Sequence, residues 1–250
     1  AMPETATVPQ NLYTLHELET ANVLRTLYTK LIAPLEPWLP EQPDRPVIVV
    51  PHGVLFRVPF SALSRYVAAA NGSDRYLIED HALAYVPSLG IMQMVRQFDR
   101  SACLDSPSLL AVVNPAFGPD FLDSAGHPFR PLPQLEADIE HVINFYEQVK
   151  LLHGMKASTD VVLAEAPNYD VVLFATHAEA LEENPMNSYL ALAGGPLRLK
   201  DIAYDRRHLN SKLVILGACE TGLGPVTGDG VEGFARWLMA SGTNALITSL

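Results

Sequence analysis

A histidine and a cysteine each follow a short apolar run in this sequence. His177 comes two residues after Val171–Ala175, and Cys219 comes three residues after Leu213–Leu216. A free thiol titrates near pH ~8.5, so an adjacent imidazole that takes its proton makes it a competent nucleophile at neutral pH. If the two runs are neighbouring strands ~4.8 Å apart, the pattern favours nucleophilic thiol chemistry.

The residues around Cys219 are small, which lets a substrate backbone approach and leaves backbone N–H groups able to stabilise an oxyanion. A lone cysteine is more often a buried small hydrophobe, and a lone histidine after a strand is more often structural. The argument for a site therefore depends on the two occurring together at equivalent strand ends. Cys103 lies in a stretch with no nearby base, and we expect it to be incidental.

Short apolar runs alternate with stretches of helical spacing along the chain. The runs predict strands at residues 47–50, 77–78, 82–86, 109–113, 171–175, 190–192, 213–216 and 245–250. Helices are predicted at residues 12–32, 88–98, 135–149 and 231–241, with another beginning at Ser158 or Thr159. Continuous apolar runs of this length are typical of strands buried on both faces, so we expect an α/β fold with a mostly parallel sheet. Chemistry in such sheets lies beyond the carboxyl ends of the strands.

The composition excludes several classes of function. The 250 residues carry a net charge of -11, which repels a phosphate backbone, so we expect no nucleic-acid partner. No apolar run approaches the ~20 residues needed to cross a membrane. Two cysteines cannot form a disulfide framework and indicate a reduced, cytoplasmic setting. Scattered histidines, and the lack of a Pro-Cys-x-x-Cys, Gly-x-Ser-x-Gly or phosphate-loop motif, lead us to expect no metal and no cofactor.

The N-terminal part differs from the rest. The predicted helix at 12–32 is followed by four prolines at 34, 37, 40 and 43, which indicate a linker. We therefore predict an N-terminal helical extension and Pro-rich linker over residues 1–44 and one domain over 45–250. Ala1 and Met2 read as a cloning remnant, and the chain stops within a predicted strand. We expect the domain to be truncated at its C-terminal end and to belong to a longer protein.

Six ordered motifs resemble those of the CHAT domain family, the caspase-like domains associated with tetratricopeptide repeats and related to caspases and separase. They lie at residues 51–63, 76–88, 114–115 with 132–133, 174–177 (Phe-Ala-Thr-His), 216–224 (Leu-Gly-Ala-Cys-Glu-Thr-Gly-Leu-Gly) and 228–236. The motifs at 174–177 and 216–224 are the most specific.

The resemblance implies a caspase-haemoglobinase-like three-layer sandwich and a cysteine endopeptidase that cleaves a protein or peptide substrate. His177 would be general base and acid, and Cys219 the nucleophile that forms a thioester. The backbone N–H groups of Ala178 and Cys219 would form the oxyanion hole. It also implies control by a tetratricopeptide-repeat or other regulatory domain. Relatives mostly have Gly at position 178 and Ser at 217, so the chain departs from the pattern at both. An alanine that needed positive φ would be strained.

Substrate preference is barely encoded. Acidic residues at Glu220, Asp229 and Glu232 could hold a basic side chain next to the scissile bond, or could instead face solvent and cap a helix. Two other readings stay open. One is an inactive or latent scaffold used for protein binding, and the other is an acyl transfer like that of glutamine amidotransferases.

Overall fold

The structure is a computed structural model that describes residues 15–42, 45–68, 72–97, 105–181, 183–204, 209–217, 226–227, 230–231 and 234–248. The chain divides into two compact units. Unit 1 comprises residues 1–49 and 57–85, and unit 2 comprises residues 50–56 and 86–250. The two predicted strands that precede His177 and Cys219 both lie in unit 2. The predicted boundary at residue 44 stays a prediction.

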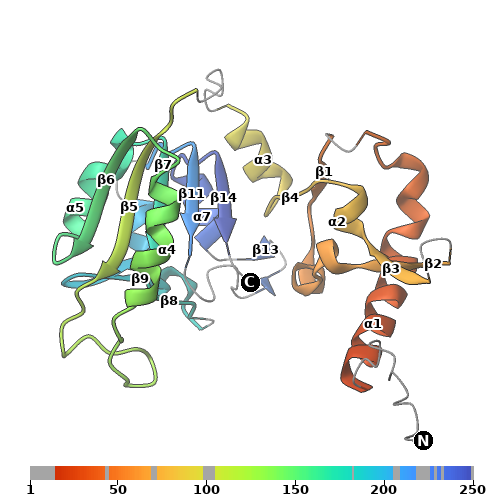
Figure 1. Ribbon diagram of the computed structural model, residues 1–250, viewed down its shortest axis with the longest axis horizontal. Coiled ribbons are helices and arrows are strands. Elements are labelled where there is room, and N and C mark those ends of the chain that lie inside the picture. Colours follow the sequence, from red (N-terminus) through yellow and green to blue (C-terminus); the bar gives the residue numbers. More distant parts are fainter. Residues whose placement is uncertain are drawn as a thin grey trace, which may run out of the picture. The chain divides into compact units, whose positions relative to one another are not determined.

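A five-stranded, fully parallel sheet forms the centre of unit 2 (Figure 1). Its strand order is β14-β11-β7-β5-β6. The strands are β5 (Ser108–Pro115), β6 (Gln148–Gly154), β7 (Val171–Ala175), β11 (Leu213–Leu216) and β14 (Ala245–Thr248). The predicted α/β class with a mostly parallel central sheet is confirmed.

Helices cover both faces of this sheet, because alternate residues of the inner strands are apolar on both sides. One face of β5 and β7 packs with Ile139 of α4, and the other packs with residues of α5, α6 and α7. Figure 1 shows α4 in front of the sheet and α5 behind it. The helices are α3 (Leu89–Val95), α4 (Pro133–Ile143), α5 (Thr159–Glu165), α6 (Leu199–Tyr204) and α7 (Phe234–Ala240), with short 3-10 turns η2 (Gly53–Arg57), η4 (Ala166–Asn168) and η5 (Pro185–Asn187).

Two small antiparallel sheets complete the described part of unit 2. The larger has the order β10-β9-β8, and the smaller pairs β12 with β13. Their strands are β8 (Ala178–Glu179), β9 (Tyr189–Leu192), β10 (Gly195–Arg198), β12 (Val226–Thr227) and β13 (Gly230–Val231). The chain passes from the end of β7 through Thr176 and His177 directly into β8, the first strand of the larger of these sheets.

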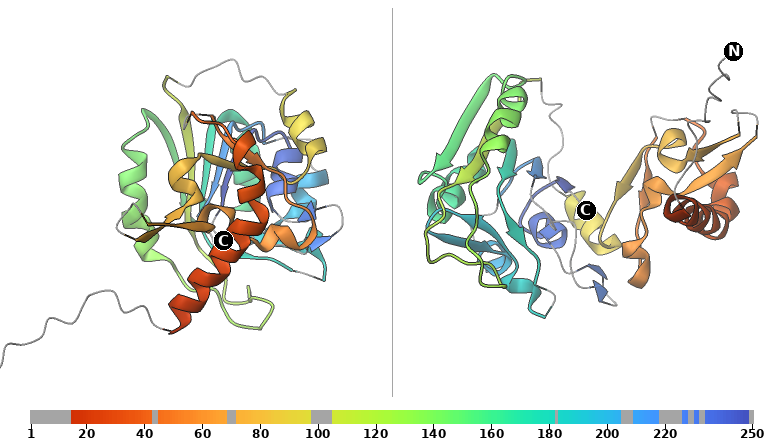
Figure 2. Two further views of the ribbon diagram at one scale, coloured as in Figure 1. Left: turned by 90° about the vertical axis from the view of Figure 1, so that its right-hand side faces the viewer. Right: turned by 60° about the horizontal axis from the view of Figure 1, so that its bottom comes forward.

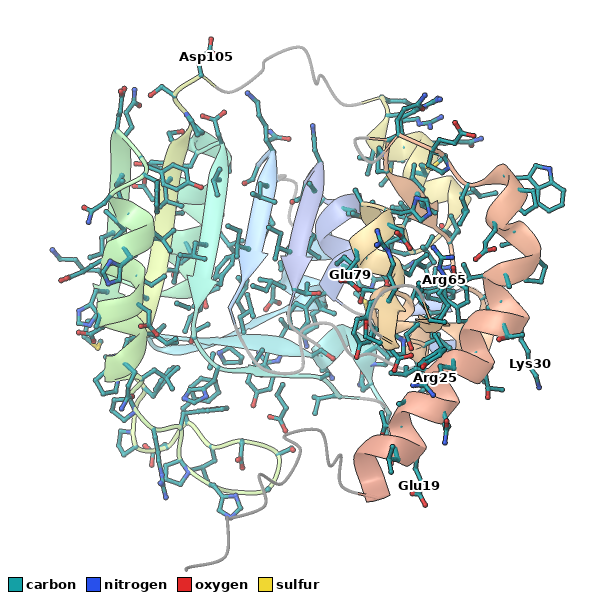
Figure 3. All side chains as sticks on the ribbon, turned by 45° about the vertical axis from the view of Figure 1, so that its right-hand side comes forward. Glu19, Arg25, Lys30, Arg65, Glu79 and Asp105 are labelled. Carbon is teal, nitrogen blue, oxygen red and sulfur yellow. The ribbon has the colours of Figure 1, made fainter. Side chains whose placement is uncertain are left out.

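Unit 1 packs α1 against the hairpin of β2 and β3 (Figure 2). Its elements are α1 (Leu15–Leu31), η1 (Ala33–Trp38), β1 (Val47–Val49), η3 (Phe60–Ala62), β2 (Ser64–Val67), β3 (Ser73–Tyr76), α2 (Leu77–Asp80) and β4 (Leu83–Tyr85). Arg25 projects from α1 and forms a two-pronged ion pair with Asp74 of the hairpin, at 2.6 and 2.8 Å (Figure 3). Desolvation and a hydrogen bond to Glu36 raise the pKa of Tyr28 to about 12.

Several elements differ from the sequence-based expectations. The predicted helix at 135–149 is too long, because it ends at Ile143 and residues 148–154 form β6. The predicted strand at 77–78 is wrong, since Leu77–Asp80 is a helical turn in which the Glu79 carboxylate accepts from the Tyr76 N–H. The strand at 47–50 is not buried on both faces, because Ile48 of β1 is exposed. The helix expected from 231 begins at Phe234.

Asp170 ties together the amino ends of three neighbouring strands. Its carboxylate accepts from the N–H and hydroxyl of Ser108, the first residue of β5, at 3.0 and 2.9 Å, and lies 3.2 Å from the ammonium of Lys212 before β11. The Ser108 backbone hydrogen bond, then its hydroxyl and Lys212, hold the pKa of Asp170 below its usual value of 3.8.

We expect Asp170→Asn to lower the free energy of unfolding by about 1–2 kcal/mol at pH 7, after allowance for partial solvent exposure. A depressed folded-state pKa stabilises above the unfolded value, so the difference from wild type should shrink as pH falls below 3.8. Urea unfolding at pH 7 and pH 3 measures it. Asp138→Asn, an exposed acid of α4, is the matched control. A loss that is the same at both pH values would contradict the electrostatic explanation.

Candidate active site

The histidine and cysteine runs are adjacent parallel strands. β7 pairs with β11 in a register that joins Phe174 to Leu216, and the Gly217 N–H donates to the Phe174 carbonyl at 2.8 Å. His177 follows Phe174 by three residues, and Cys219 follows Leu216 by three residues. The expectation that the two runs lie side by side is confirmed. Cys219 itself lies outside the described residues, as do Cys103, Glu220, Asp229 and Glu232.

The backbone on each side of His177 is held by β9. The buried Thr176 hydroxyl donates to the Ala191 carbonyl at 2.6 Å, and the Ala191 N–H donates to the His177 carbonyl at 2.9 Å. These bonds fix the direction in which the chain leaves β7. They also explain why a threonine precedes the histidine, because a buried hydroxyl needs a partner.

The imidazole of His177 is oriented by a backbone carbonyl. Its Nε2 lies 2.7 Å from the Arg130 carbonyl oxygen, which can only accept. Nε2 therefore carries the hydrogen, and Nδ1 of the neutral ring is the unprotonated nitrogen. The rings of Phe117 and Phe129 pack on the imidazole at centroid distances of 5.5 and 5.1 Å. The contacts therefore fix the orientation of the His177 ring and leave Nδ1 as its acceptor nitrogen.

The loop at residues 116–132 supplies this carbonyl and both aromatic rings. Asn114, near the end of β5, links the two ends of the loop, because its Oδ1 accepts from the Leu132 N–H at 2.8 Å. Farther along, the Glu179 carboxylate accepts from the Ser124 N–H at 3.0 Å and from the Tyr189 hydroxyl. Desolvation and this hydrogen bond raise the pKa of Tyr189. Glu179 is thereby a positioning residue for the loop over His177.

The direction of the Ala178 backbone N–H follows from how β8 pairs with β9. In the β8–β9 ladder Ala178 pairs with Leu190, and the bond from Ala191 to His177 makes this the pair without mutual hydrogen bonds. The Ala178 N–H therefore points away from β9. Among the described residues, positive φ outside glycine occurs only at Asn114 and Asn210, so alanine at 178 is not strained.

Sequence reasoning missed the groups that orient His177. Arg130 lies 47 positions from the histidine it contacts, and a backbone carbonyl has no signature in a sequence. The signal that was available is the aromatic content of the loop, with Phe117, Phe121 and Phe129 within 13 positions directly after a strand. These rings, with Tyr189, form one cluster.

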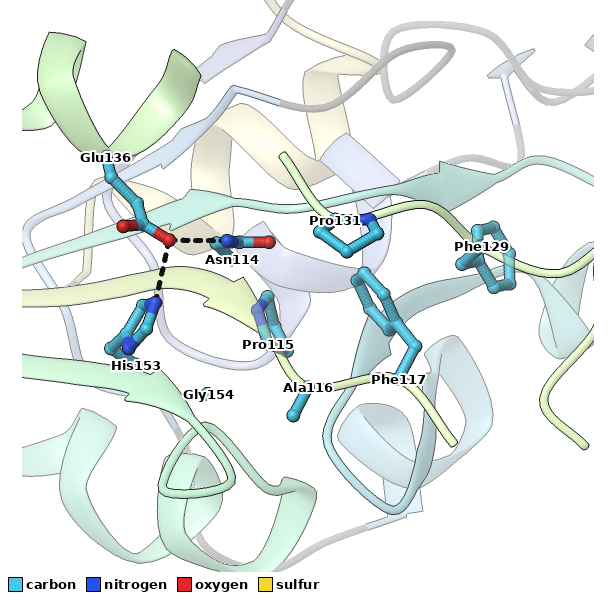
Figure 4. Close-up of a pocket in the computed structure, with 9 residues that line it drawn as sticks. All are labelled: Asn114, Pro115, Ala116, Phe117, Phe129, Pro131, Glu136, His153 and Gly154. Carbon is cyan, nitrogen blue, oxygen red and sulfur yellow. Dashed lines mark hydrogen bonds and ion pairs between the residues drawn. The ribbon is translucent and has the colours of Figure 1, made fainter. Parts of the chain in front are cut away.

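A second polar cluster lies at the ends of β5 and β6, next to a cavity of about 340 Å³ (Figure 4). Glu136 Oε1 accepts from Asn114 Nδ2 at 2.5 Å and from His153 Nε2 at 2.8 Å. The hydrogen bonds from Asn114, then from His153, hold the pKa of Glu136 below its usual value, so the carboxyl is ionised at neutral pH. Asn114 adopts φ +42°, a conformation that asparagine tolerates better than most residues.

No three His, Cys, Asp or Glu side chains of the described segments gather closely enough to hold a metal ion. Nor is any helix in the part of the chain that the structure describes long and apolar enough to cross a membrane.

These features define an α/β domain in which two adjacent parallel strands are followed in the sequence by His177 and by Cys219. Residues 21–250 match the family described as the CHAT domain, and the chain belongs to that family. The recognition made from the motifs is confirmed. The parallel sheet with helices on both faces agrees with the three-layer architecture that the resemblance implies.

The individual relatives share about a quarter of their aligned residues with this chain. The chain is 26% identical over 274 residues to tetratricopeptide repeat protein 28 of Homo sapiens and 27% identical to that of Mus musculus. Each match covers 91% of this chain and 11% of the relative. Among solved structures, the Arg-specific cysteine proteinase gingipain R matches with a TM-score of 0.45 and 12% identity, covering 90% of this chain and 49% of that one.

Proposed function

We propose that unit 2 is a caspase-like cysteine endopeptidase domain that cleaves a protein partner through a Cys219–His177 dyad. The observation that carries the proposal is the β7–β11 register, because it gives His177 and Cys219 equal offsets from paired residues on strands ~4.8 Å apart.

The proposed reaction uses the tautomer that Arg130 enforces. His177 Nδ1 takes the Cys219 thiol proton as the sulfur attacks the scissile carbonyl carbon, and the oxyanion accepts from the Ala178 and Cys219 N–H groups. The C–N bond then breaks, and the Nδ1 proton passes to the leaving amine. Water activated by His177 hydrolyses the thioester, which releases the acid product and restores the thiol.

The remaining parts of the proposal concern partners and setting. The similarity to tetratricopeptide repeat protein 28 supports control by a tetratricopeptide-repeat domain in the same chain or in a partner chain. Glu220 and Asp229 stay the proposed contacts for a basic side chain next to the scissile bond. A reactive reduced thiol fits the proposed cytoplasmic location.

Covalent labelling tests the dyad. A fluorescent acyloxymethyl ketone peptide probe should label the wild-type chain and fail to label Cys219→Ala. Cys103→Ala, which removes the other cysteine of the sequence, is the matched control and should label as wild type does. Unchanged labelling of Cys219→Ala would refute the proposal. An absence of labelling in all three, with a properly folded chain by circular dichroism, would favour the inactive scaffold instead.

A further inference from the structure

We propose that the cavity at the ends of β5 and β6 is a subsite for a long basic side chain of the substrate, on the leaving-group side of the scissile bond. The inference rests on the proposed function and names a specificity pocket for it. It is carried by the position of the cavity, by its lining and by the single carboxylate at its polar end.

The position follows from the strand order. The cavity is lined at the ends of β5 and β6, whereas Cys219 follows β11, and β7 with His177 lies between them in the sheet. His177 gives its proton to the leaving amine, so the part of the substrate that departs lies on the His177 side of the nucleophile. Phe117 and Phe129 line the cavity and also contact the His177 ring. The cavity and the histidine therefore share one wall.

The lining has an apolar part and a polar end. Two aromatic rings and the small or ring side chains of Pro115, Ala116 and Pro131 form the apolar part. Glu136 and His153 form the polar end, and each is nearly half exposed, at 44% and 49% of the side chain. An aliphatic stem can lie along the apolar wall while its charged head reaches the rim.

The charge selects a cation. Oε1 of Glu136 receives both hydrogen bonds from Asn114 and His153, and no described residue donates to Oε2 (Figure 4). His153 donates through Nε2 to Oε1, so Oε2 of the ionised Glu136 carboxylate is left as a free acceptor. The net charge of -11 adds a favourable long-range field for a positive ligand. Arginine and lysine side chains meet these requirements, whereas acidic side chains are repelled.

The first experiment measures binding without any turnover. We expect N-acetyl-arginine methylamide to bind the full wild-type chain more tightly than the citrulline analogue, which keeps the shape and lacks the charge, as measured by saturation-transfer NMR titration. Glu136→Gln should weaken binding of the arginine compound about tenfold, or about 1.4 kcal/mol. Glu140→Gln removes the same charge from an exposed position of α4 and should bind as wild type does. Equal affinity for both analogues, tighter binding of N-acetyl-tyrosine methylamide, or no effect of Glu136→Gln would overturn the proposal.

The second experiment assigns the side of the scissile bond. Cleavage sites in a chymotryptic peptide library, read by mass spectrometry, should be enriched in Arg or Lys at the first or second position after the cleaved bond, and Glu136→Gln should abolish this enrichment. Cleavage without the preference would refute the subsite alone. Arginine-analogue binding without cleavage of any peptide would refute the endopeptidase function and, with it, the role of the cavity as a substrate subsite.

Discussion

Replacing His177 with alanine is expected to slow acylation of Cys219 by a peptide substrate or probe about a thousandfold, within the 10²–10⁴ range that a positioned general base supplies. The reason is geometric. The Arg130 carbonyl fixes the hydrogen on Nε2, and Phe117 and Phe129 hold the plane of the ring. On the proposed mechanism, Nδ1 is therefore oriented to act as the base before substrate binds.

Two measurements test this prediction. The first is the rate constant for labelling by the peptide probe in wild type and His177→Ala. The second is alkylation by iodoacetamide between pH 6 and 9 in a Cys103→Ala background, where Cys219 is the one remaining thiol. Loss of the imidazole should move the apparent titration of the thiol toward ~8.5 and leave little thiolate at pH 7. Added imidazole should restore part of the rate.

His127→Ala is the matched control, because His127 lies in the same loop as Arg130 and its side chain is 76% exposed. Its labelling rate should stay within twofold of wild type. A His177→Ala rate within tenfold of wild type, or an alkylation profile that does not move, would show that His177 does not act as the base.

Replacing Phe174 with alanine is expected to lower the free energy of unfolding of unit 2 by about 3–5 kcal/mol. Phe174 is 1% exposed and belongs to the larger apolar cluster, on the sheet face covered by α5, α6 and α7. The neighbouring strands on both sides hold the backbone in place, so the site cannot collapse to fill the space of a deleted ring. The cost of the residual cavity then adds to the lost burial.

Fluorescence of Trp237 measures this loss within unit 2. A Trp38→Phe background removes the other tryptophan, which lies in unit 1, so that urea unfolding reports on α7 and the core around it. Phe145→Ala, at a position 86% exposed, should change stability by less than about 0.5 kcal/mol. A Phe174→Ala loss below about 1 kcal/mol would mean that the core repacks around the missing ring.

Three inner strands of the sheet were predictable because burial on both faces leaves a continuous apolar run. Residues 109–113, 171–175 and 213–216 are such runs, and they form the body of β5, β7 and β11. β6 was missed for the opposite reason. It is an edge strand with several exposed positions, and its Lys150 and His153 interrupt the apolar pattern, so its start resembles the end of a helix. The strand predicted at Leu77 and Ile78 was wrong, because two consecutive apolar residues are equally compatible with a helical turn.

The sequence alone determined the family, the α/β class and the two strand ends that carry His177 and Cys219, since these depend on local composition and on the order of motifs. The tertiary structure alone decided the pairing register of β7 with β11, the tautomer of His177 and the cavity beside Glu136. Each of these arises where side chains or carbonyls far apart in the chain come within hydrogen-bonding distance, and no local pattern encodes such a contact. Arg130 and His177, 47 residues apart, are the clearest instance.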